Sequence, residues 1–89
     1  MQIDFKKEIK ALNGEAYKEN MASVVANHLF NAKSDDPLKT HDWALKLHND
    51  GVIEVDSSDI NKLTEAIKKF EIPDGVLGQI LKELFSQKG

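Results

Sequence analysis

The chain of 89 residues carries a formal net charge of −3, with 40% of its residues hydrophobic and 30% charged. This length suits one domain, residues 1–89, and the balance is typical of a soluble globular protein rather than a disordered one. The absence of cysteine excludes disulfides and thiolate metal sites. No apolar run approaches the roughly 20 residues of a membrane span, and the N-terminus lacks a signal peptide's apolar centre, so we expect a cytoplasmic protein.

Arginine is absent, and acidic residues outnumber lysines in residues 34–71. Arginine supplies the bidentate contacts to phosphate and guanine that many nucleic-acid-binding proteins use. Both features argue against a protein dedicated to nucleic acid.

Hydrophobic and charged residues alternate from Ile3 to Ala11, with Lys7 as the one exception on the apolar side. A period of two predicts a half-buried strand. Asn13-Gly14 then predicts a hairpin turn. Because an isolated hairpin is only marginally stable, we expect this one to lie on helices.

The loop length of this hairpin decides where Tyr17 lies. A two-residue loop would set Tyr17 opposite Lys10 on the charged side. A three-residue loop, Leu12-Asn13-Gly14 with a bulge at Gly14, would set it opposite Ile9 on the apolar side. We expect the second arrangement because it buries the ring.

Two helices are predicted next. Asn20 can cap a helix from about Met21 to Ala32. Asp36-Pro37 starts a second helix, to about His48, with an acceptor at the cap and proline at the first position. Gly51 can take the left-handed conformation that ends it.

The second half of the chain reads as an extended piece and two further helices. Residues Val52–Val55 either add a third strand or cross the core. Asp56-Ser57-Ser58-Asp59 resembles a capping box for a helix from Ser58 to Phe70. Asp74 caps a last helix to about Ser86, in which Gly78 costs about 1 kcal/mol unless a close packing contact offsets it. The inner face of the helix before Pro73 is expected to consist of Ile60, Leu63, Ile67 and Phe70.

The predicted fold class is therefore α+β. It comprises an N-terminal β-hairpin packed on about four short helices, with a third short strand as an open alternative.

Four apolar side chains are candidates for an interaction surface: Leu77, Leu81, Phe85 and Trp43. The last helix has an apolar face wider than one packing seam, so the side with Leu77, Leu81 and Phe85 either meets the hairpin or stays partly open. An open patch would favour self-association, most often as a two-fold homodimer. If Leu38 and Leu45 mark the inward side of its helix, Trp43 is half-exposed; it is then either an interface anchor or closes the core against the hairpin, which we favour.

The sequence predicts no catalytic, cofactor-binding or metal-ligating residues, so we expect neither an enzyme nor a cofactor. His28, His41 and His48 lack zinc-site spacing, and the acidic residues Asp50, Glu54, Asp56 and Asp59 lack a calcium-binding loop. Ser57 and Ser58 lie where helix caps are needed, and no nucleotide-binding or nucleophile motif occurs.

The hairpin carries four lysines, namely Lys6, Lys7, Lys10 and Lys18. A solvated face is the favoured interpretation, since Asp4 and Glu8 are interleaved with them. A nucleic-acid surface is the alternative.

Several segments together resemble small uncharacterised proteins encoded by bacteriophages and prophages. They are Ile3-Asp4-Phe5, Leu12-Asn13-Gly14, the helix segment from Trp43 to Leu47, Asp56–Asp59 and Gly78-Gln79-Ile80-Leu81. The resemblance implies a bacterial or viral cytoplasmic setting and an accessory role, in assembly or in binding a host or phage protein. It implies no catalytic or ligand-binding residue.

Two functions remain as hypotheses. The first is a non-catalytic protein-interaction or assembly protein that binds a protein partner or itself. The second is a nucleic-acid-binding regulator that uses the basic hairpin, which salt-dependent binding would reveal.

Overall fold

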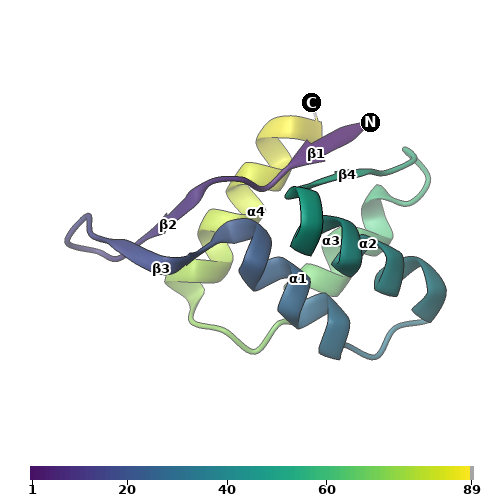
Figure 1. Ribbon diagram of the computed structural model, residues 1–89, viewed down its shortest axis with the longest axis horizontal. Helices are drawn as coiled ribbons and strands as arrows, with labels where there is room; N and C mark the ends of the chain where they lie inside the picture. Colours follow the sequence, from purple (N-terminus) through teal and green to yellow (C-terminus); the bar gives the residue numbers. More distant parts are fainter. Residues whose placement is uncertain (89) are drawn as a thin grey trace.

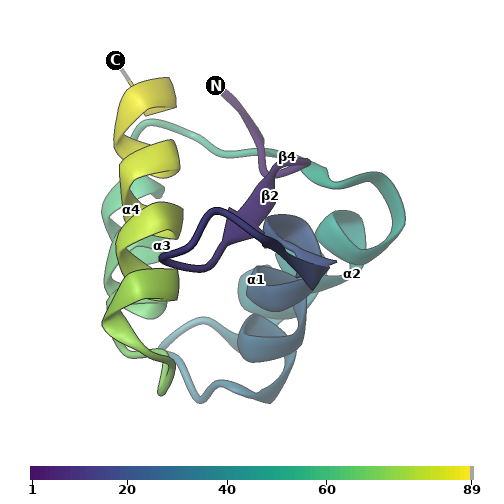
Figure 2. The same cartoon turned by 90° about the vertical axis from the view of Figure 1, so that its left-hand side faces the viewer.

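The computed structural model describes residues 1–88 and confirms an α+β fold with an N-terminal hairpin. The elements in chain order are β1 (Gln2–Asp4), β2 (Glu8–Lys10), β3 (Ala16–Asn20), α1 (Met21–Asn31), α2 (Pro37–Asp50), β4 (Val52–Glu54), α3 (Ile60–Lys68) and α4 (Asp74–Lys88). In Figure 2, α3 and α4 lie on one side and α1 and α2 on the other, with the N-terminal strands between them.

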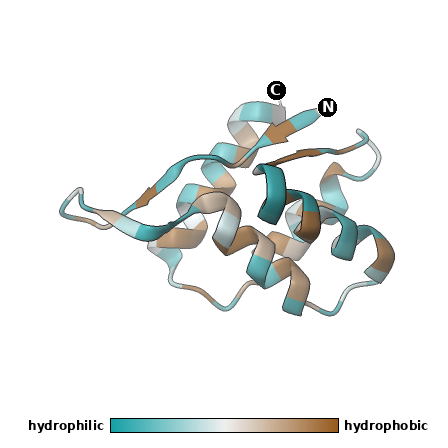
Figure 3. Ribbon diagram, in the orientation of Figure 1, coloured by the Kyte–Doolittle hydropathy of each residue, from teal (hydrophilic) through white to brown (hydrophobic). Residues whose placement is uncertain are grey.

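The predicted N-terminal strand is in fact two strands in two small sheets. β1 pairs antiparallel with β4, so the Val52–Val55 piece does add a strand, while β2 pairs with β3. The break falls at the predicted exception, Lys7, whose N–H donates to the Phe5 carbonyl at 2.7 Å. This tight turn leaves Lys7 exposed while Phe5 and Ile9 on either side are fully buried. Figure 3 shows hydrophobic residues on β1 and β4.

The predicted three-residue hairpin loop is confirmed. Gly14 N–H donates to the Ala11 carbonyl at 2.9 Å, Ala11 N–H donates to the Glu15 carbonyl at 2.8 Å, and Gly14 has φ +89°. The predicted burial of Tyr17 is wrong, since the residue is 47% exposed. The pairing register shifts between Lys10 and Glu8, and β3 is exposed along its whole length. Figure 1 shows that the tip of the hairpin extends beyond the helices.

The predicted caps of α1 and α2 are confirmed. Asn20 Oδ1 accepts from Ser23 N–H at 2.9 Å, Asp36 Oδ1 accepts from Lys39 N–H at 3.3 Å, and Gly51 has φ +74°. Leu38 and Leu45 do not mark the inward side of α2, so the condition for a half-exposed Trp43 is not met. The inward side consists of Thr40, Trp43, Ala44 and Leu47, whereas Leu38 and Leu45 face solvent. Trp43 is 4% exposed and therefore belongs to the core.

The core joins all four described helices to β1 and β4. α3 begins at Ile60, and of its predicted inner face Leu63 and Ile67 are fully buried, Phe70 is buried and Ile60 is partly buried. In α4, Val76, Ile80 and Leu84 are buried. The predicted capping box is wrong in one respect: the Asp59 side chain does not cap α3 but is buried and pairs with Lys39 on α2.

Two glutamines of α4 bond the backbone of the N-terminal strands. Gln87 accepts from the Asp4 N–H at 2.7 Å and donates to the Asp4 carbonyl at 2.7 Å. Gln79 does the same with Lys10, at 3.0 Å and 2.8 Å. These amides satisfy strand backbone groups that have no ladder partner, so they hold α4 against both β1 and β2.

Gly78→Ala is expected to stabilise the protein by about 1 kcal/mol. No close packing contact offsets the cost of Gly78, since a Cβ built there would meet no atom within 4 Å. Alanine would therefore add helix propensity without strain. Urea denaturation measures the change. Gly51→Ala is the control and should lose stability, because Gly51 has φ +74° and its new Cβ would collide with the Lys6 side chain.

Within residues 1–88, no helix is both long enough and apolar enough to cross a membrane.

Candidate functional site

A hollow with a volume of about 790 Å³ lies on one side of the described structure. It lies between the end of α1, the loop to α2, the start of α2 and the outer side of α3. We call it the α1–α3 groove. Its lining includes Ala32, Thr40, Trp43, Ala66 and Phe70, and its volume falls in the range of about 300–1,000 Å³ that is usual for ligand sites.

Aromatic side chains contribute much of the apolar lining. Trp43 and Phe70 are both buried, so each presents only part of its ring to the groove. The ring of His28 lies beside that of Phe70, with 5.0 Å between centroids. His28 Nδ1 is 2.9 Å from the Val24 carbonyl, which can only accept, so Nδ1 carries the proton.

A second hollow of about 320 Å³ lies beyond His28. Its lining is largely apolar, with Tyr17 from β3, Val24 from α1, and Ile72, Pro73 and Val76 from the α3–α4 connection. His28 lines both hollows, so the His28–Phe70 contact stands between them. The half-exposed Tyr17 that sequence reasoning assigned to the core instead forms part of this second hollow.

An ion pair next to the α1–α3 groove joins α2 to the start of α3. Lys39 Nζ on α2 donates to Asp59 Oδ2 at the start of α3, and Lys62 Nζ lies 3.8 Å from Asp59 Oδ1. The hydrogen bond from Lys39 lowers the pKa of Asp59 below its ordinary range and raises the pKa of Lys39. The sequence offered no signal for this pair beyond the charges themselves, because the partners lie on different helices.

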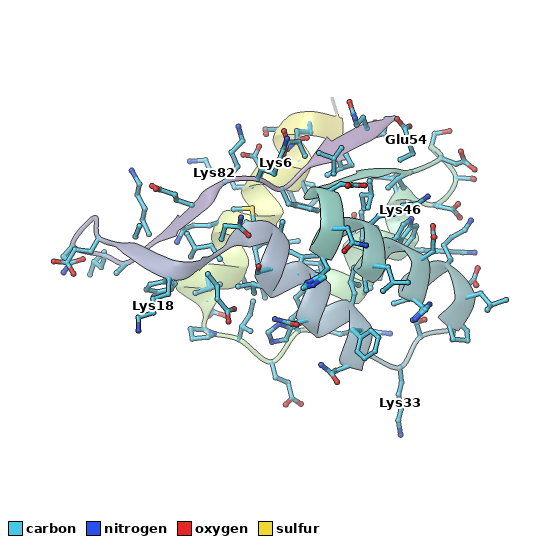
Figure 4. All side chains as sticks on the ribbon, viewed as in Figure 1. Lys6, Lys18, Lys33, Lys46, Glu54 and Lys82 are labelled. Carbon is cyan, nitrogen blue, oxygen red and sulfur yellow. The ribbon has the colours of Figure 1, made fainter. Side chains whose placement is uncertain are left out.

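The rim carries mixed charge. Lys33 and Asp35 lie on the α1–α2 loop, and Lys69 and Glu71 lie just beyond α3. Within residues 1–88 none of these four forms an ion pair, and Figure 4 shows Lys33 directed away from the body of the protein. Each side of the groove therefore carries one lysine and one acidic side chain that form no ion pair within the described residues.

Hydroxyl groups at this groove have structural roles. Thr40 Oγ1 donates to the Asp36 carbonyl at 3.0 Å, and Ser34 Oγ lies 2.8 Å from Thr40 Oγ1, to which it can donate. In the described part of the chain, neither hydroxyl is bonded to a carboxylate or an imidazole. The arrangement fixes the α1–α2 loop and lacks the base that would activate a nucleophile.

Acidification is expected to destabilise the protein partly through Asp59. Because its pKa is lowered in the folded state, the stabilisation it provides is complete at neutral pH and is lost as the pH falls from about 5 through the folded pKa. Asp59→Asn should therefore be less stable at pH 7 and lose less stability on acidification. Urea midpoints measured from pH 7 to pH 2 test this.

Asp42→Asn is the matched control, since Asp42 is an exposed partner of Lys46 at 3.2 Å. The urea midpoint of Asp42→Asn should stay near that of the wild type at pH 7. If the urea midpoints of the wild type and Asp59→Asn fell in parallel as the pH is lowered, the role given to Asp59 would be contradicted.

The structure separates the four residues that the sequence predicted as an interface. Trp43 lies in the core and at the edge of the α1–α3 groove. Leu77 and Leu81 on α4 are partly buried and pack against the core, and Phe85 is half-exposed. The partly open side of α4 is thus present, but Trp43 is not part of it.

The remaining candidate groups do not converge. His41 lies beside Phe30, with 5.8 Å between ring centroids, while His28 contacts Phe70. No group of three or more potential metal-binding side chains occurs within residues 1–88. The hairpin lysines are all exposed, and Figure 4 shows Lys6 and Lys18 well apart.

Comparison with protein families, with curated proteins and with solved structures found no match to this chain.

Proposed function

We propose that this protein is a non-catalytic interaction module that binds a peptide segment of a protein partner in the α1–α3 groove. The observation that carries the proposal is the groove itself, with Trp43, Ala66 and Phe70 in its lining and free charges of both signs on its rim. Hydrophobic and aromatic side chains predominate in the lining of binding pockets.

The chemistry of the lining favours a peptide over a small polar ligand. Within residues 1–88 no fully buried side-chain nitrogen or oxygen lacks a hydrogen-bond partner, so no buried polar atom at the base of the groove awaits a ligand. Attraction must come from apolar contact in the groove and from charge at the rim. A segment with an apolar anchor flanked by both an acidic and a basic residue meets both requirements.

The second hollow extends the proposed site. It begins on the other side of His28 and is lined mainly by Val24, Ile72 and Val76. An extended peptide could place one apolar side chain in each hollow and pass over the His28–Phe70 contact. Peptides selected for binding should therefore have apolar residues at two positions of their sequence.

Selection of random peptides displayed on phage against the immobilised protein tests the proposal. Wild-type protein should enrich peptides with spaced apolar anchors. Ala66→Glu would place a carboxylate in the groove lining and should abolish that enrichment, whereas Ala16→Glu, the same change at an exposed site on β3, should preserve it. Titrating a selected peptide should also shift the emission of Trp43, the single tryptophan.

Equal recovery on the wild type and on Ala66→Glu would refute the groove as the binding site. The accessory role in phage or host assembly implied by the sequence resemblance stays a prediction, as does a cytoplasmic location.

Nucleic-acid binding by the hairpin is the competing proposal. Lys7, Lys10 and Lys18 are exposed and form no ion pair within the described residues. Binding to mixed-sequence DNA or RNA that falls steeply between about 50 and 200 mM salt would support it over the groove proposal.

A further inference from the structure

The outer side of α2 carries a regular stripe of exposed side chains. Leu38, His41, Leu45 and His48 are spaced by three, four and three residues, which places them along one side of the helix. Leu38 is 84% exposed and Leu45 is 43% exposed, although both are leucines on a helix that buries its opposite side. We call these four residues the α2 stripe.

An aromatic side chain of α1 widens the stripe. Phe30 is 61% exposed, and its ring lies 5.8 Å from that of His41. Phe30, Leu38 and Leu45 are three of the seven large hydrophobic residues that the described structure leaves exposed. Their grouping on adjacent helices forms an apolar patch of the kind that marks an association surface.

We propose that the α2 stripe binds a second copy of this chain, with the two α2 helices antiparallel about a two-fold axis at the level of Trp43. In this register Leu38 faces the partner's His48, and His41 faces the partner's Leu45. The stripe is therefore complementary to itself: each leucine meets an imidazole and each imidazole a leucine. A parallel arrangement would set like residues opposite one another.

Charge at the side of the stripe fits the same register. Asp42 and Lys46 lie on the side of α2 away from Phe30 and form an ion pair at 3.2 Å. A two-fold axis brings this side of both helices together, so Lys46 comes within one helical turn of the partner's Asp42. On the other side, Phe30 is flanked by the neutral Asn27 and Asn31, so no like charges are forced together there.

The size of the patch sets the strength of the dimer. From Leu38 to His48 the stripe spans roughly 15 Å at 1.5 Å per residue. Such a contact is smaller than the interfaces of about 1,200 Å² that hold stable complexes, so we expect a reversible dimer with a Kd on the order of 100 µM. This surface is distinct from the α1–α3 groove.

Sedimentation equilibrium from about 10 µM to about 1 mM protein tests the proposal. Wild type should dimerise with concentration, and Leu38→Glu should weaken the dimer by more than about tenfold, because it removes the leucine contact and takes a carboxylate out of water. Leu38→Glu should fold normally, since the site is exposed and lies in the first turn of a helix. Leu12→Glu, at the fully exposed hairpin tip, is the matched control and should dimerise like the wild type.

Separate variants test the charge pairing across the dimer and the antiparallel register. Lys46→Asp should weaken the dimer about tenfold, and adding Asp42→Lys to it should restore association. Because the chain has no cysteine, Leu38→Cys and His48→Cys proteins can be mixed and cross-linked with a short thiol-specific reagent. The antiparallel register predicts more mixed product than random pairing would yield.

A wild type that stays monomeric to about 1 mM would overturn the proposal. So would a dimer insensitive to Leu38→Glu, which would instead direct attention to Leu81 and Phe85 on α4. Ala66→Glu should leave self-association unchanged, so failure of the groove proposal and failure of this one are distinguishable.

Discussion

Leu63→Ala should destabilise the protein by about 2–5 kcal/mol, the usual cost of removing a buried leucine side chain. Leu63 is fully buried at the centre of the inner face of α3, so the substitution both removes apolar contact and leaves a cavity. Urea denaturation followed by circular dichroism gives the change in the free energy of unfolding. For an 89-residue domain, whose total stability is on the order of 5–10 kcal/mol, the loss would be a large fraction.

Leu12→Ala is the matched control, because it makes the same change at the fully exposed hairpin tip. It should alter stability by less than about 0.5 kcal/mol. A Leu63→Ala loss below about 1 kcal/mol would contradict the placement of Leu63 at the centre of the core.

Trp43→Ala is expected to cost about 3–5 kcal/mol, the largest effect of any single truncation considered. The indole is 4% exposed and belongs to the core cluster. Its removal therefore takes apolar contacts from the neighbouring side chains and leaves a cavity. The measurement must use circular dichroism, because the substitution removes the only tryptophan.

Trp43→Phe should lose less stability, since phenylalanine fills much of the same volume. Equal losses for the two variants would contradict this, since they would mean that the phenylalanine ring restores none of the lost packing. A Trp43→Ala protein as stable as the wild type would show that Trp43 is peripheral to the core.

Local signals in the sequence were confirmed where a few neighbouring residues decide the geometry. Asn20 and Asp36 each provide a side-chain acceptor for the first turn of a helix. Gly14 and Gly51 adopt positive φ, which glycine does at little cost. The 3.6-residue spacing on α3 correctly predicted that Leu63 and Ile67 face the core.

The same kind of reasoning left α2 open, because two inward directions were possible. On α2, Trp43 lies on a different side of the helix from Leu38 and Leu45. Hydrophobicity alone did not decide which side faces the core, although a core position was favoured for Trp43. The structure buries Trp43 together with Thr40 and Ala44. Leu38 and Leu45 are then left exposed, and the self-association proposal depends on that outcome.

The candidate groove could not be predicted from the sequence. Its lining comes from α1, the α1–α2 loop, α2 and α3, whose relative placement no local pattern specifies. The Lys39–Asp59 pair joins residues that are 20 apart in the chain, and the Gln87–Asp4 bonds join residues that are 83 apart.

By itself, then, the sequence determined the turn at Gly14, the starts of α1 and α2, the end of α2 and the inner face of α3. These features depend on backbone and side-chain contacts within a turn or two, so they can be read from neighbouring residues. Only the tertiary structure decided that β1 pairs with β4, that Tyr17 lines a hollow, that Asp59 pairs with Lys39 and that Leu38 and Leu45 face solvent. Each of these depends on how distant segments pack together, because burial and ion pairing are properties of the assembled surfaces rather than of any one segment.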